Sequence, residues 1–243
     1  MVVLAVTVHD PVGRLAAAVD RLAGPLRRVF PGIVANISDA TRPEVVAAIE
    51  GLGARTMIHA AGEAIIGRAR RDAVAMAAGE TALYSDLDHL LRWIETDEAD
   101  LRRVLASEAE ADLLVVGRSP AALAREPQRL QQTERLVNHV HFLLTGADWD
   151  LMFAVRRLSP AAVGLIVSES REETLANDVE WPLLARRAGL RLGYARSDAL
   201  FYRTIEEFGA ARDSGDAEPL QWIRRLEFAA LQAGAMRRFL GER

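Results

Sequence analysis

Residues 81–88 read Thr-Ala-Leu-Tyr-Ser-Asp-Leu-Asp, and this stretch decides the fold because an apolar run ends in two aspartates one residue apart. The run from Thr81 to Tyr84 is typical of the end of a buried strand. Side chains two residues apart on a strand point to the same side, and hard divalent cations that bind diphosphates prefer oxygen ligands. Asp86 and Asp88 therefore predict a clamp for a metal ion and a diphosphate.

The chain before and after this stretch alternates between strand and helix patterns. Val2–Val8 is a continuous run rich in β-branched residues that ends at Asp10-Pro11, which is typical of a strand buried on both faces. Strands are predicted at 2–8, 33–37, 55–59, 81–84 and 112–117, with an amphipathic helix after each of the first four. The order predicts an α/β fold with a mostly parallel central sheet and helices on both faces.

The second half is less regular. It predicts helices at 121–145 and 178–188, an apolar segment at 162–167, strands at 190–195 and 200–203, and a polar linker at 211–218. Leu220, Ile223, Leu226 and Ala230 mark a terminal helix. We expect one domain over 1–209, in two halves 1–118 and 119–209, followed by a linker and helix over 210–243. The terminal stripe could meet a second copy in a homodimer, but packing within its own chain is favoured.

The composition excludes several classes of protein. Half of the 243 residues are apolar and the formal net charge is -4, so the chain can build a sizeable core and has no bulk positive field. We therefore expect no nucleic-acid partner. All basic side chains other than histidine are arginine, so mechanisms that need a lysine amine are excluded. The absence of cysteine fits a reducing compartment, and we expect a cytoplasmic protein.

Two further segments bear on targeting. Met1–Val6 is apolar but lacks a basic leading region, so it is interpreted as a first strand and not as a signal peptide. No apolar run approaches the length that spans a bilayer, and we expect no membrane span.

Ligands of open α/β sheets bind outside the carboxyl ends of the strands. The loops that begin at His9, Ser38 and Ser85 should therefore share one crevice, which brings Asp10, Asp39, Asp86 and Asp88 together. Carboxylates at such short range repel each other unless a cation or hydrogen-bond donors compensate their charge. For each aspartate alone, a solvated loop position or a helix N-cap remains the alternative.

A family resemblance rests on these residues. The segments 2–10, 36–41 and 69–73, followed by Gly79-Glu80 and the aspartate pair, resemble the nucleotide-sugar half of family-two glycosyltransferases with the A-type fold. Segments 111–118, 150–160 and 177–194 are similar to later parts of polyprenyl-phosphate sugar transferases, and the resemblance covers about 2–204. It implies a metal-dependent, inverting transfer of a sugar from a nucleoside-diphosphate sugar to an unknown hydroxyl or phosphate acceptor.

The resemblance also implies roles for individual residues. Asp88 would bind Mg²⁺ or Mn²⁺ at the donor diphosphate, and Asp86 would contact the metal or the ribose. Asp39 would receive the base or ribose, and Arg70, less securely Arg68, would contact the diphosphate, although a solvated helix face is the alternative for both arginines. Thr7 and His9 complete the expected donor site.

An inverting transferase needs a base that accepts the proton of the attacking hydroxyl. The resemblance gives Asp178 the position of this base, and Glu180 is the alternative. A purely structural role as a helix N-cap is the other interpretation of Asp178. The chain departs from the family at Asn177, where a glutamate is usual, and at 151–154, where polyprenyl-phosphate enzymes have a glycine-rich turn. The acceptor is therefore not defined.

Two other readings compete with a transferase. The departures favour a homologue that binds a nucleotide sugar without turnover, or a scaffold. A phosphohydrolase with an aspartate nucleophile is disfavoured, because such sites usually carry a lysine and this chain has none. His139 and His141 are two residues apart on a predicted helix, where they face different sides, so a metal site there is disfavoured.

Overall fold

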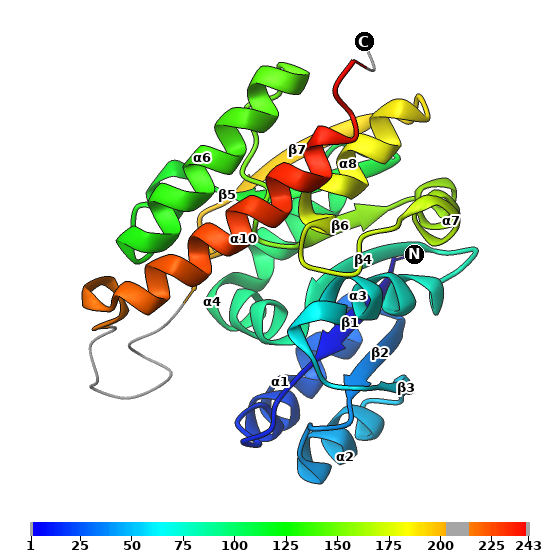
Figure 1. Ribbon diagram of the computed structural model, residues 1–243. Helices are drawn as coiled ribbons and strands as arrows, with labels where there is room; N and C mark the ends of the chain where they lie inside the picture. Colours follow the sequence, from blue (N-terminus) through cyan, green and yellow to red (C-terminus); the bar gives the residue numbers. More distant parts are fainter. Residues whose placement is uncertain (1, 203–213, 242–243) are drawn as a thin grey trace.

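The computed structural model describes residues 2–202 and 214–241, and these form a seven-stranded sheet with helices on both faces (Figure 1). The strand order is β3-β2-β1-β4-β6-β5-β7. The strands are β1 (Val2–Val8), β2 (Gly32–Ser38), β3 (Arg55–His59), β4 (Thr81–Asp86), β5 (Leu113–Arg118), β6 (Val155–Leu158) and β7 (Leu192–Ser197). All strands except β6 run parallel to one another, so the predicted mostly parallel sheet is confirmed.

The strand β6 is antiparallel to both of its neighbours, β4 and β5, and the sequence did not predict it. Its sequence is Val-Arg-Arg-Leu, and two central arginines are not typical of a buried strand. The structure shows how both are accommodated. Arg156 donates to the carbonyl oxygens of Leu151 and Asp178, and Arg157 donates to backbone carbonyls that follow α4 (Leu87–Ala106). Hydrogen bonds to backbone oxygen replace the water that the guanidinium groups lose.

The two faces of the sheet carry separate cores, because alternate residues of each strand point to opposite sides. Leu4, Val6 and Val8 of β1 belong to the core that includes α1 (Leu15–Val29), α2 (Pro43–Gly51) and α4. Ala5 belongs to the opposite core, which includes α3 (Ile66–Ala75), α7 (Pro160–Glu169) and α8 (Asn177–Arg187). The predicted two-sided α/β fold is therefore confirmed.

The helix α6 (Gln128–Thr145) follows the short α5 (Pro120–Leu123) and packs against the terminal helix α10 (Pro219–Arg237), as Figure 1 shows. Two 3₁₀ turns, η1 (Glu63–Ile65) and η2 (Ser214–Ala217), complete the elements of the described residues. The helix α10 also packs against α8, and its buried residues are Gln232, Ala235 and Met236. Within residues 2–202 and 214–241, no helix combines the length and apolarity needed to traverse a bilayer.

Two expectations for the second half were wrong. The apolar stripe of the terminal helix does not pack on its own chain, because Leu220, Ile223 and Leu226 are 50–57 % exposed and the opposite side of α10 is buried. The strand predicted at 200–203 is absent from its described part, Leu200–Tyr202, where the backbone is irregular. Arg203, the domain boundary expected at 209/210 and the start of the predicted linker lie outside the described residues.

A buried ion cluster joins the end of β5 to α6. Arg118 is 2 % exposed, and its guanidinium donates to Asp150, at 2.8 Å from Nε, to Glu126 and to Glu134. Burial lowers the pKa of Arg118, but the three carboxylates outweigh it, and the pKa lies well above its ordinary value. Asp150, which the sequence placed in an acceptor-side segment, is thus part of an internal ion network.

His141 on α6 is buried without a carboxylate partner among its contacts, and burial lowers its pKa from 6.5 to about 4. Between these values the unfolded chain binds more protons than the folded one, so the free energy of unfolding falls as the pH is lowered from 6.5 to 4. The full effect is on the order of 3 kcal/mol. His141→Asn should therefore reduce the fall in the free energy of unfolding between pH 6.5 and pH 4, as measured by urea unfolding. His139→Asn, at an exposed position of the same helix, should leave this fall unchanged. Equal slopes for all three proteins would contradict the assignment.

Candidate active site

A cavity of about 640 Å³ opens at the carboxyl ends of β1, β2 and β4. These strands are neighbours and run parallel, so the residues that follow them meet at one edge of the sheet. The cavity is lined by Thr7, Val8, His9, Ser38, His59, Ala61, Gly62, Glu63, Ile66, Ala69, Arg70, Asp86, Asp88 and His89. Five of the predicted site residues thus line one cavity, namely Thr7, His9, Arg70, Asp86 and Asp88.

Asp86 is held by three donors from the protein itself. Its Oδ1 accepts hydrogen bonds from the Thr7 hydroxyl at 2.7 Å and the Tyr84 hydroxyl at 2.6 Å. Its Oδ2 accepts from Arg70 at 2.8 Å. Burial raises the pKa of Asp86, but Arg70 and the hydroxyl donors outweigh burial, and the pKa lies well below its ordinary value. Asp86 is therefore a fixed carboxylate at the cavity wall.

Arg70 connects the cavity to the first turn of α8. One terminal nitrogen donates to Asp86, and the other donates to Asp178 at 3.0 Å and to Asn177 at 3.1 Å. Arg70 is 7 % exposed, and its Nε has no hydrogen-bond partner among the described residues. This atom is itself buried, so Arg70 acts on the cavity through its charge.

The approach of α3 to the loop before α8 depends on a glycine. Gly67 donates its N–H to the carbonyl oxygen of Glu173 at 2.7 Å. A Cβ at this position would lie 2.8 Å from the carbonyl oxygen of Glu172 and would overlap that of Thr174. Since backbone atoms cannot yield as a flexible side chain can, only glycine permits this contact. The contact brings Arg70 to Asn177 and Asp178.

Burial and neighbouring charges shift the pKa values of Asp178 and Arg70 to different extents. Burial raises the pKa of Asp178, and the attraction of Arg70 and Arg156 only partly offsets this, so the pKa stays above its ordinary value. For Arg70, burial lowers the pKa, but Asp86 and Asp178 outweigh it, and the guanidinium stays charged. The group therefore contains a firmly ionised Asp86, a cationic Arg70, and an Asp178 that accepts a proton more readily than a free aspartate.

Asp88 is the more accessible member of the aspartate pair. It lies in the first turn of α4 with 37 % of its side chain exposed, and it forms an ion pair with Arg92 one turn later. The Nε2 atom of His89 lies 3.8 Å from Asp88 Oδ2. The His89 ring stacks on Phe153 at a centroid distance of 4.3 Å, and its Nδ1 has no partner among the described residues.

Two more histidines stand at the ends of β1 and β3. His9 Nδ1 is hydrogen-bonded to Ser38 Oγ at 2.7 Å, and His59 Nδ1 to Asn36 Oδ1 at 2.9 Å. Burial lowers the pKa of His59, although Asp39 opposes the shift. These hydrogen bonds join β1, β2 and β3 at the wall of the cavity.

Asp10 and Asp39 are not among the residues that line this cavity, so the four carboxylates do not share one crevice. Asp10 lines a neighbouring cavity together with His9 and Asp88. Asp10 accepts hydrogen bonds from the N–H groups of Val12, Gly13 and Leu15, and so fixes the loop that starts α1. Asp39 accepts from the N–H of Ala61 at 2.9 Å. Both carboxylates stabilise loops in the way that the alternative interpretation predicted.

The two candidate bases also lie outside the lining of the cavity. Asp178 is 6 % exposed and faces Arg70. Glu180 is 2 % exposed and accepts hydrogen bonds from the Ser170 hydroxyl and from the N–H groups of Arg171 and Glu172. Arg238 completes its environment with an ion pair at 3.1 Å. Glu180 therefore orders the loop before α8.

The carboxylates of the cavity fit a divalent ion through Asp88 better than through Asp86. Both oxygens of Asp86 already accept hydrogen bonds, whereas Asp88 is partly exposed at the cavity. Within the described ranges, no cluster of three or more His, Asp or Glu side chains is arranged to hold a metal. A site of one carboxylate completed by phosphates and water is nonetheless a common arrangement for Mg²⁺.

Sequence reasoning placed the loop that begins at Ser38 at the crevice but missed His59, Glu63 and His89 as lining residues. A signal existed for the partner of Asp88, because Arg92 follows it by four residues on a predicted helix. No comparable signal existed for Glu63, which lies in the short 3₁₀ turn η1.

Of the comparisons with known proteins, only the comparison with solved structures found similar proteins. No protein-family model matches the sequence, and no curated protein matches it. The fold is similar to crystal structures of glucosyl-3-phosphoglycerate synthase from Mycobacterium tuberculosis, with a TM-score of 0.58 at 13 % identity over 94 % of this chain and 80 % of that one. The complex of that enzyme with UDP gives a TM-score of 0.61 at 12 % identity, covering 94 % and 79 %.

A further crystal of the same enzyme holds Mn²⁺, UDP-glucose and phosphoglyceric acid, and it gives a TM-score of 0.58 at 12 % identity, covering 93 % of this chain and 80 % of the other. These likenesses show that the chain has the A-type glycosyltransferase fold. At such identity they show the fold alone.

Proposed function

We propose that the protein is a metal-dependent glycosyltransferase that uses a nucleoside-diphosphate sugar. The observation that carries the proposal is the cavity at the carboxyl ends of β1, β2 and β4, where Asp88 is accessible beside the charged Arg70. The likeness to an enzyme crystallised with Mn²⁺ and UDP-glucose supports it. The acceptor is a hydroxyl or phosphate compound of undefined class.

Asp88 would hold Mg²⁺ or Mn²⁺, and this ion would offset the charge that gathers on the departing nucleoside diphosphate. Arg70, fixed between Asp86 and Asp178, would supply a second positive charge close to the diphosphate. Asp86 would act by orienting Arg70. Thr7 and His9 would contact the nucleoside, with Asp39 behind them in the loop after β2.

Asp178 is the carboxylate that we assign as the base for the acceptor. A base near neutral pH needs a raised pKa, and burial raises that of Asp178. Glu180, the alternative, is committed to Ser170 and the adjacent N–H groups, whereas Asp178 is joined through Arg70 to Asp86 at the cavity wall. The inverting outcome follows from direct displacement assisted by this one base.

A binding protein without turnover is the second candidate function. The engagement of both Asp86 oxygens by Thr7, Tyr84 and Arg70 favours it, since Asp88 then remains as the one metal ligand of the aspartate pair and itself forms an ion pair with Arg92. A phosphohydrolase is disfavoured by the same contacts, because its nucleophile would be Asp86 and both oxygens of Asp86 are engaged.

Asp88→Asn should abolish metal-dependent turnover. In a screen of nucleoside-diphosphate sugars with Mn²⁺ and candidate acceptors, release of the nucleoside diphosphate should fall by about 100-fold or more, the loss typical of a removed transition-state charge contact. Asp20→Asn, at an exposed position of α1, is the matched control and should retain full activity. If the wild-type protein binds the donor but releases no diphosphate with any acceptor, the binding protein is the correct reading.

A further inference from the structure

The helices α6 and α10 present an apolar face to solvent. They pack side by side on the outside of the molecule (Figure 1). Most of the large apolar side chains that are exposed in residues 2–202 and 214–241 belong to these two helices or to the turn that follows α10. On α6, Leu136, Val140 and Leu143 recur at i, i+4 and i+7 and are 37–67 % exposed. Such a concentration of exposed apolar side chains on one face marks an interaction surface.

The solvent-facing side of α10 continues this surface. Leu220, Ile223 and Leu231 are 42–57 % exposed, and helical spacing places them on one side of α10. Ala230 and Gly234 lie on the same side and are exposed as well. A Cβ at Gly234 would meet no atom within 4 Å, so the backbone of α10 is open to a close neighbour at this point. This side of α10 therefore has room for another helix.

Two opposite charges stand on the same side of α10. Arg224 and Glu227 are three residues apart and exposed, and neither forms an ion pair within the described residues. A surface of one sign, such as an anionic membrane, would attract Arg224 and repel Glu227. A second copy related by a two-fold axis satisfies both charges, because it places Arg224 of each chain opposite Glu227 of the other. The charge pattern is therefore complementary to itself.

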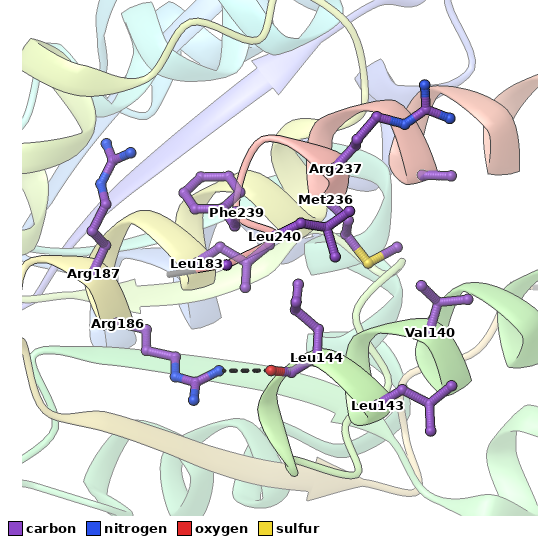
Figure 2. Close-up of a pocket in the computed structure, with 12 residues that line it drawn as sticks. Val140, Leu143, Leu144, Leu183, Arg186, Arg187, Met236, Arg237, Phe239 and Leu240 are labelled. Atoms are coloured by element: carbon purple, nitrogen blue, oxygen red, sulfur yellow. Dashed lines mark hydrogen bonds between the residues drawn. The ribbon is translucent and has the colours of Figure 1, made fainter. Parts of the chain in front are cut away.

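The same pairing brings apolar surfaces together. Across a two-fold axis perpendicular to α10 the two helices run antiparallel, so residue numbers fall along one helix as they rise along the other. Pairing of Arg224 with the partner's Glu227 then sets Leu220 opposite the segment 231–234 of the partner's α10. Ala233 of this segment lines an apolar groove of about 650 Å³, which lies between α6 and the end of α10 (Figure 2). The ion pairs and the apolar contact thus require the same register.

We infer that the protein forms a homodimer in which α6 and α10 of the two copies pack face to face. The two α10 helices cross the two-fold axis antiparallel to each other, and the α6 helices extend the apolar contact on either side. Four helices then share one apolar interior, as in a helix bundle. This inference does not depend on the proposed glycosyltransferase activity.

Sedimentation velocity of the full chain over a range of concentrations tests the inference. The wild type should sediment as a dimer. Ile223→Asp should sediment as a monomer, because it places a charge without a partner in the apolar contact. Ile58→Asp, at an exposed position of β3, is the matched control and should remain a dimer. The substituted side chains are exposed, so thermal unfolding should show that each variant is folded.

A charge exchange tests the two-fold pairing itself. Arg224→Glu and Glu227→Arg should each weaken dimerisation by at least about tenfold, because each variant brings like charges together twice across the axis. The double variant Arg224→Glu/Glu227→Arg should recover dimerisation, and an equimolar mixture of the two single variants should form a mixed dimer. Glu50→Arg, at an exposed position of α2, is the control and should dimerise as the wild type does.

Three results would overturn the inference. These are a wild-type monomer at every concentration, a dimer that Ile223→Asp leaves intact, and a double variant that dimerises no better than the single variants. Binding of a monomeric chain to phosphatidylglycerol vesicles would assign the face to a membrane surface and would contradict the dimer as well.

Discussion

Arg118→Met is expected to cost about 3–5 kcal/mol of the free energy of unfolding, because it leaves buried carboxylates without their shared cation. Glu126 and Asp150 are 4 % and 6 % exposed, and Glu134 retains its ion pair with Arg225 at 2.5 Å. Burial already raises the pKa of Glu126 while Arg118 is present. Removal of Arg118 should raise it further.

The sign of the pH dependence provides a second measurement on this variant. With Arg118 absent, the folded protein should take up protons that the unfolded chain does not, so the deficit in stability should shrink as the pH is lowered toward 5. Glu126→Gln in the same background should recover part of the loss. The matched control is Arg21→Met, which breaks an ion pair with Glu95 whose side chains are 55 % and 41 % exposed, and it should cost less than about 1 kcal/mol. Urea unfolding that gives equal losses for both arginines would refute the buried cluster.

Arg70→Met should likewise cost about 3–5 kcal/mol, since Asp86 and Asp178 would face each other without the cation between them. It should also remove donor binding, because the variant loses the positive charge at the cavity wall. Arg70→Lys should recover only part of either property, because one ammonium group cannot reproduce the planar fork that reaches both carboxylates.

A triple variant separates the cause from a general packing defect. Arg70→Met combined with Asp86→Asn and Asp178→Asn removes the unpaired charges and should regain most of the stability, but no donor binding. If Arg70→Met alone changes the free energy of unfolding by less than about 1 kcal/mol, the three side chains do not form the buried link described here.

The first half of the fold was predictable because its strands are continuous apolar runs. In Val2–Val8 and Thr81–Asp86, burial on both faces leaves a clear pattern, and the crevice at their carboxyl ends follows from the rule for open sheets. Thr7, His9, Arg70, Asp86 and Asp88 were accordingly found on one cavity.

The remainder depended on long-range pairing. Strand β6 contains two buried arginines, and Arg157 donates to the carbonyl oxygen of Ser107, 50 residues earlier in the chain, so the local pattern does not predict a strand. The role of Asp86 as a partner of Arg70 depends on the close approach at Gly67, which no local pattern encodes. The departure at Asn177 now has a physical reason. A neutral amide accepts from Arg70, where a glutamate would add a third carboxylate around one guanidinium.

The central claim is that this cavity binds a nucleoside diphosphate together with a divalent cation held by Asp88. The most direct measurement is calorimetric titration of the wild-type protein and of Asp88→Asn with UDP and the other nucleoside diphosphates, in Mn²⁺ and again in EDTA. The account predicts binding to the wild type that requires Mn²⁺ and is lost in Asp88→Asn. The absence of binding by every nucleoside diphosphate in Mn²⁺, or equal binding by the variant, would contradict it.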